Sequence, residues 1–103
     1  MKGCFHTMNE KLTLWLEQNE KTFAENGIIQ IERYEYNNES LVVQHETDLY
    51  IGEITARIDY FTDIQVLEIK TGELVLCMHC MCREDMEISP MLDMYMNFIK
   101  RRI

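Results

Sequence analysis

The 103-residue sequence lacks a long uninterrupted apolar run. Its apolar stretches fall far short of the roughly 20 residues that a helix needs to cross a bilayer. Residues 1–6 lead into polar positions rather than into the apolar core of a secretory signal. We therefore expect a protein that is made and kept in the cytoplasm.

Basic residues are also scarce. Ten Lys and Arg stand against 18 Asp and Glu, which gives a net charge of −8, and three of the ten basic residues lie at positions 100–102. Nucleic acids and anionic membranes bind cationic surfaces, so both are disfavoured as partners. The acidity suits a basic protein partner, whose approach would be electrostatically steered. The alternative is that the acidity serves only to keep the protein soluble.

The recognised motifs of several enzyme classes are missing. The sequence contains no G-x-x-x-x-G-K-S/T, G-x-G-x-x-G, G-x-S-x-G or H-E-x-x-H pattern. With 18 acidic residues some carboxylates will lie in pairs by chance, so such pairs do not indicate acid–base catalysis. We expect no catalytic residues, no cofactor and no metal ligands.

The cysteines offer the main alternative. Cys77, Cys80 and Cys82 fall within one predicted strand, whose neighbouring positions point to opposite faces. A zinc or thiol module built on these cysteines is an alternative function. However, no turn residue near Cys77 and Cys80 would let their two sulfurs converge on a metal ion, and the sequence has no second C-x-x-C pair. A cysteine nucleophile with His79 or His45 as its base has no supporting spacing. Reduced thiols that pack in the core are the preferred interpretation.

Residues 50–60 predict the central strand of the fold. There Ile54, Ala56, Ile58 and Tyr60 alternate with Thr55, Arg57 and Asp59, the period of two that marks one buried and one solvated face. Gly52 in this strand indicates either a bulge or a close backbone approach.

The remaining pattern predicts one helix before and one helix after a sheet. Thr7 and Glu10 form a capping box ahead of a helix over 8–26, and Gly27 follows at its C-terminal cap. Strands are predicted at 28–36, 41–46, 64–70 and 74–82, and a second helix at 89–99 carries the apolar stripe Leu92, Tyr95, Met96 and Ile99. Short connections favour an antiparallel meander. The expected fold is a single α+β domain over 1–103, with five strands and both helices on one face of the sheet.

Acidic and aromatic residues of the strands and loops are the candidate binding residues. Tyrosine supplies contact area at low entropic cost, and carboxylates meet Arg and Lys of a partner. The partner-binding prediction comprises Glu32, Tyr34, Tyr36, Glu53, Asp59, Tyr60, Phe61 and Asp63.

An ordered set of motifs resembles a known family. The set is Leu12, Trp15-Leu16, Glu25-Asn26-Gly27, Ser40-Leu41-Val42-Val43, Ile51-Gly52-Glu53-Ile54-Thr55, Thr71-Gly72-Glu73 and a short C-terminal helix. From about residue 12 to residue 99 the chain is similar to small bacterial immunity proteins of polymorphic toxins, including TriTu-like proteins of contact-dependent growth inhibition. Where related sequences often have a glycine after the central strand, this chain has Tyr60-Phe61-Thr62-Asp63.

The resemblance implies a function that the charge balance permits. The protein would bind the C-terminal nuclease domain of a cognate toxin, with a ribonuclease as the nearest match, and block its substrate or active site. A nuclease cleft is basic because it binds phosphate, so an acidic inhibitor suits it. A homodimeric scaffold formed by sheet faces or edges is a further alternative.

Overall fold

The computed structural model describes residues 8–36, 40–57, 61–81 and 88–100. The chain forms α1 (Met8–Gln18), α2 (Glu20–Glu25), β1 (Ile29–Tyr36), β2 (Ser40–Glu46), β3 (Tyr50–Arg57), β4 (Phe61–Glu68), β5 (Leu74–Met81) and α3 (Ser89–Ile99). The strands form one antiparallel sheet in the order β1-β2-β3-β4-β5, with each strand bonded to its neighbour in sequence. The predicted α+β class and the meander are confirmed.

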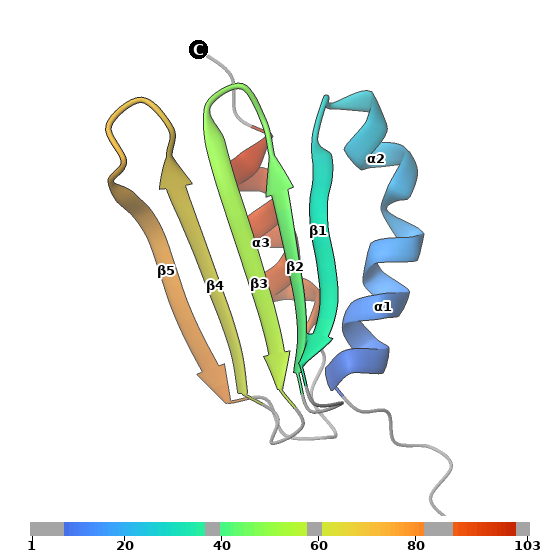
Figure 1. Ribbon diagram of the computed structural model, residues 1–103. Helices are drawn as coiled ribbons and strands as arrows, with labels where there is room; N and C mark the ends of the chain where they lie inside the picture. Colours follow the sequence, from blue (N-terminus) through green and yellow to red (C-terminus); the bar gives the residue numbers. More distant parts are fainter. Residues whose placement is uncertain (1–7, 37–39, 58–60, 82–87, 101–103) are drawn as a thin grey trace, which may run out of the picture.

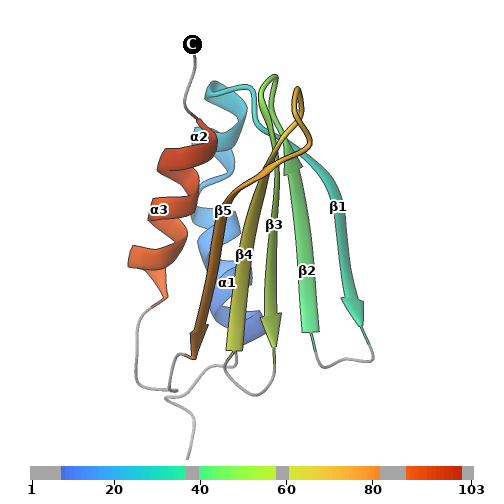
Figure 2. The ribbon, with the colours of Figure 1, turned by 90° about the vertical axis from the view of Figure 1, so that its left-hand side faces the viewer.

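The molecule has two layers (Figure 1). Seen along the sheet in Figure 2, the three helices of the described residues lie on one side of the strands, and none of them lies on the other side. The structure thus confirms that the helices share one face. Among the described residues, no helix is both long enough and apolar enough to cross a membrane.

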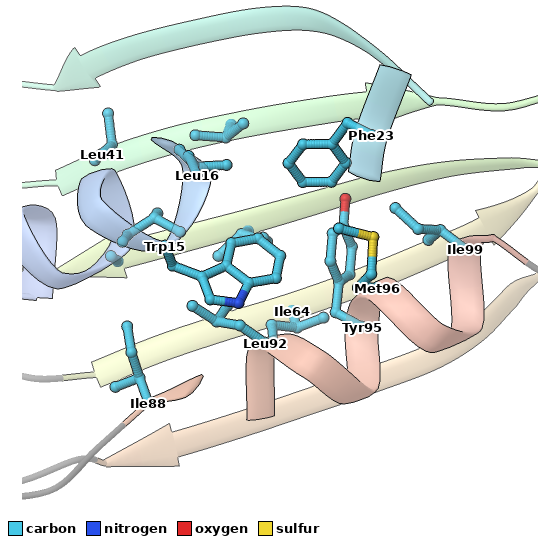
Figure 3. Close-up of a cluster of buried hydrophobic side chains, with 14 of the residues drawn as sticks. Trp15, Leu16, Phe23, Leu41, Ile64, Ile88, Leu92, Tyr95, Met96 and Ile99 are labelled. Atoms are coloured by element: carbon cyan, nitrogen blue, oxygen red, sulfur yellow. The ribbon is translucent and has the colours of Figure 1, made fainter. Parts of the chain in front are cut away.

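The core fills the space between the helices and the sheet (Figure 3). Every second residue of the inner strands points into it, and Val43, Ile54 and Ile64 are adjacent across β2, β3 and β4. The predicted stripe of α3 is buried as a whole. Ala56 is also buried, as expected, whereas Ile58 and Tyr60, predicted to share its face, lie outside the described residues.

The predicted single N-terminal helix is wrong in one respect: it is two helices that meet at Asn19. The Asn19 side-chain amide donates to the Trp15 carbonyl oxygen at 2.8 Å, and the Asn26 amide does the same to Thr22 at the end of α2. An Asn side chain that bonds the backbone in this way competes with the helical hydrogen bonds and favours a helix end. Thr7, the expected capping residue, lies outside the described residues.

A register shift in β1 decides which of its side chains face outward. Gln30 pairs with His45, but Glu32 pairs with Gln44, so Ile31 is an extra residue in the ladder. Such a bulge changes the alternation of the strand. As a result Glu32 and Tyr34 lie on the helix-free side, together with the residues of β2 that they pair with.

Gly52 marks a close approach, the second of the two readings of its position. A Cβ atom placed there would lie 2.6 Å from Cε1 and 2.8 Å from Cζ of Tyr95, well inside van der Waals contact. The absence of a side chain therefore lets the Tyr95 ring of α3 lie directly against β3. In α3, Ile88 occupies the cap position and Ser89 is the first helical residue.

Candidate functional site

The helix-free side of the sheet is called the open face below. Side chains that are cross-strand neighbours in an antiparallel pair share a face, so the register defines its members. They are Ile29, Glu32 and Tyr34 of β1, Val42, Gln44 and Glu46 of β2, Ile51, Glu53, Thr55 and Arg57 of β3, Phe61, Asp63, Gln65 and Leu67 of β4, and Cys77, His79 and Met81 of β5.

The open face brings together most of the predicted partner-binding residues that the structure describes. Glu32, Tyr34, Glu53, Phe61 and Asp63 all point to this side of the sheet. The Tyr36 side chain, Asp59 and Tyr60, which complete the predicted set, lie outside the described residues. The predicted set is therefore one surface as far as it is described.

Apolar side chains are exposed on this face beside the acidic ones. Tyr34 is 45% exposed, Phe61 36% and Met81 58%, and Leu67 and Ile29 are exposed as well. Exposed apolar side chains gathered on one face and flanked by charged residues are typical of interaction surfaces.

The charges of the open face are mostly negative but partly paired. Carboxylates come from Glu32, Glu46, Glu53 and Asp63, and Arg57 contributes a guanidinium. The Gln44 amide donates to Oε1 of Glu53 at 2.7 Å. One Asp63 oxygen lies 3.9 Å from Arg57, and the other lies 2.6 Å from Nδ1 of His79.

Cys77 belongs to the same group and is exposed, so the expectation that the thiols pack in the core is wrong for this residue. Its sulfur lies 3.5 Å from Nε2 of His79, on the same face of β5. Cys80 points to the opposite face, where it is half-buried against the core, as a strand requires.

The zinc alternative finds no support in this geometry. Within the described ranges, no three His, Cys, Asp or Glu side chains are placed to hold a metal ion. Cys77 and Cys80 are on opposite faces of the sheet, and Cys82 lies outside the described residues.

His45 and His79 lie on opposite faces of the sheet, so they do not form a pair. His45 is buried under the helices, where its ring stacks on Phe23 with centroids 4.6 Å apart and its Nδ1 lies 2.7 Å from the Tyr95 hydroxyl. Burial lowers the pKa of His45 to about 4. Burial also raises the pKa of Tyr95, and the negative charge of Glu53 raises it further because it disfavours the tyrosinate anion.

A cavity of about 320 Å³ adjoins His45 between α2 and β1. Leu16, Phe23 and Ile28 form its apolar wall, and Glu20 and Arg33 contribute charged groups. It lies on the helix side of the sheet, so it is separate from the open face.

Comparison with known proteins gives the family of the chain. No curated protein and no solved structure matches it. The sequence model of the family described as Immunity protein TriTu matches residues 10–98, which confirms the resemblance inferred from the motifs. Because this match covers most of the sequence, the chain belongs to the TriTu family of immunity proteins, which act by neutralising a cognate toxin protein and are generally not enzymes.

Proposed function

We propose that this immunity protein neutralises a basic nuclease domain, a ribonuclease, at the C-terminus of a contact-dependent growth inhibition toxin. It does so in the cytoplasm by covering the substrate cleft of the nuclease with its open face. The observation that carries this proposal is the joint placement of carboxylates and exposed apolar side chains on one uncovered sheet face.

Charge supports a nuclease as the partner. A ribonuclease binds the phosphates of its substrate with Lys and Arg, so its cleft attracts an acidic surface. Glu32, Glu46 and Glu53 present carboxylates on the open face of a chain whose net charge is −8. Tyr34 and Phe61 add apolar contact area, which strengthens a complex that the charges steer into place.

The test begins with the C-terminal domain of the protein encoded immediately upstream. That domain is co-expressed with the immunity protein, and co-purification, growth rescue and cleavage of RNA are measured. We expect a stable complex, restored growth and loss of RNA cleavage. A toxic domain that binds and is neutralised but does not cleave RNA would overturn the ribonuclease assignment alone.

Hydrogen–deuterium exchange of the same complex locates the interface. We expect protection of β3 and β4 amides and of their open-face neighbours, with little change in α1. Protection confined to the helices would overturn the open face as the toxin-binding surface. Light scattering on the immunity protein alone addresses the homodimer alternative, for which a monomer is the expected result.

A further inference from the structure

Three side chains on the open face lie in a line across β4 and β5. His79 is the cross-strand partner of Asp63, and Cys77 stands two residues before His79 on the same face. The Asp63 Oδ1 to His79 Nδ1 distance is 2.6 Å, and the His79 Nε2 to Cys77 Sγ distance is 3.5 Å. The imidazole thus bridges a carboxylate and a thiol.

This order of groups fixes the direction of the hydrogen bonds. The Asp63 carboxylate accepts a hydrogen bond from Nδ1–H of His79, so in the neutral ring Nε2 carries a lone pair and faces the thiol. Arg57 lies 3.9 Å from the other Asp63 oxygen, so the carboxylate has a guanidinium on one side and the imidazole on the other. A nucleophile within reach of a base that a third group orients is the signature of an activated nucleophile.

We propose that Cys77 is a base-assisted thiol that forms mixed disulfides with small disulfides such as oxidised glutathione. His79 takes the proton from Cys77, and the thiolate sulfur attacks one sulfur of the disulfide. A new S–S bond forms to Cys77 as the original S–S bond breaks. The second half leaves as a thiolate and takes up a proton, so Cys77 is oxidised and the released half is reduced.

The surroundings select this reaction over acyl transfer. Cys77 and His79 are exposed on a strand at the edge of the described sheet, and the cavity beside His45 lies on the opposite side. Acyl transfer needs a cleft and donors for an oxyanion, whereas disulfide exchange needs an accessible sulfur and a proton acceptor. The proposal is independent of toxin binding, although both concern the same face.

Single-thiol variants make the test specific, because the chain has four cysteines. The variant C4S/C80S/C82S keeps Cys77, and C4S/C77S/C82S keeps Cys80. Each is treated with 5,5′-dithiobis(2-nitrobenzoate), and separately with oxidised glutathione followed by mass measurement. At neutral pH we expect Cys77 to react about tenfold faster than Cys80 and N-acetylcysteine, a modest gain for a positioned base.

Substitution of the base separates proton transfer from mere exposure. His79→Gln in the Cys77-only chain should reduce the rate to that of N-acetylcysteine, and Asp63→Asn should give an intermediate rate. Glu73→Gln, in the exposed loop between β4 and β5, is the matched control for loss of a carboxylate and should leave the rate unchanged. Near-ultraviolet circular dichroism of the buried Trp15 checks that each variant is folded.

The pH profile gives a second readout, which a purely structural role of His79 would not move. Within the part of the chain that the structure describes, the charged or titratable groups beside Cys77 on the open face are His79, Asp63 and, through Asp63, Arg57. With His79 present, the rate should fall less steeply toward mildly acidic pH than in His79→Gln. Equal rates and equal profiles in the two chains, or a Cys77 no faster than N-acetylcysteine, would overturn the proposal.

Discussion

The Tyr95 hydroxyl of α3 lies 2.7 Å from Nδ1 of His45 on β2, and both side chains are buried. Gly52 is the cross-strand neighbour of His45, and it leaves the space in which the Tyr95 ring lies. Tyr95 stays protonated because burial raises its pKa. Its hydroxyl therefore donates to the neutral imidazole, so a pair of polar groups inside an apolar core is satisfied across the two layers.

This pair predicts a pH dependence of stability. Burial lowers the pKa of His45 to about 4, compared with 6.5 for an ordinary histidine. Between these values the unfolded chain binds more protons than the folded chain, so the free energy of unfolding falls as the pH drops from 6.5 toward 4. The shift corresponds to a loss of about 3 kcal/mol. Urea denaturation at a series of pH values measures it.

The double variant His45→Leu/Tyr95→Phe removes both polar groups and should lose this part of the pH dependence. His79→Gln, on the open face, should retain it. The slope against pH is the readout, so a lower stability of the double variant at neutral pH does not affect the test. An unchanged slope between pH 6.5 and pH 4 would show that His45 does not titrate in this way.

Gly52→Ala should destabilise the fold by about 1–3 kcal/mol, the usual cost of overpacking a core. The new methyl group would meet Cε1 and Cζ of Tyr95 at 2.6 and 2.8 Å, so the α3 ring or β3 must move. Thermal and urea denaturation measure the change.

The control is the same substitution in a Tyr95→Leu background. There the added methyl group should cost much less, because the ring that it meets is gone. Gly72 has φ +74°, and a Cβ atom placed there would have no neighbouring atom within 4 Å. The cost of Gly72→Ala should therefore be the same in both backgrounds. Equal costs of Gly52→Ala in the two backgrounds would exclude the ring as the cause.

Much of the fold follows from periodicity in the sequence. The alternation around Ile54 and the helical stripe from Leu92 to Ile99 are strong because each element buries one face. The break at Asn19 was not predicted, since it depends on whether the Asn19 side-chain amide or the helical backbone makes the hydrogen bonds at this point. The bulge at Ile31 arises from pairing with β2, which the β1 sequence alone does not specify.

The candidate surface was predictable in part for the same reason. Alternation placed Glu53 on the solvated face of β3, and short connections brought the neighbouring strands beside it. The juxtaposition of Asp63 and His79 was missed. If the pairing of β4 and β5 continued without a shift from the Leu67–Leu74 pair beside the turn, Asp63 would lie opposite Met78. His79 would then lie on the other face of the sheet from Asp63. A register shift between Val66 and Leu67 moves the pairing by one residue, and no sequence signal marks it.

The indole of Trp15 links the first helix to the last. Its Nε1–H donates to Oδ1 of Asp93 at 3.1 Å, while the ring itself is buried. Asp93→Ala would leave this N–H without its partner and should lower the free energy of unfolding by about 1–3 kcal/mol. Asp93→Asn keeps an acceptor and should cost less. In a Trp15→Phe background Asp93→Ala should cost almost nothing, and a full cost there would show that the hydrogen bond is not responsible.

Charge reversal on the open face tests the proposed approach to the toxin. Glu32 and Glu53 lie in one cross-strand row, joined through Gln44. Changing both to Lys should slow association with the toxin domain about tenfold at low salt, because electrostatic steering raises on-rates by this order or more. Stopped-flow or surface plasmon resonance kinetics measure the rate. Added salt should slow the wild-type association but have much less effect on the reversed variant.

Glu17→Lys is the control for position, because Glu17 is exposed on α1 in the helix layer. It makes the same change of charge per site without altering the open face, and its association rate should stay close to that of the wild type. If Glu17→Lys slows association as much per charge as the open-face changes do, steering depends only on net charge. If both the reversed variant and Glu17→Lys bind at the wild-type rate, the carboxylates of the open face do not meet the toxin, and the interface must be sought on the helices.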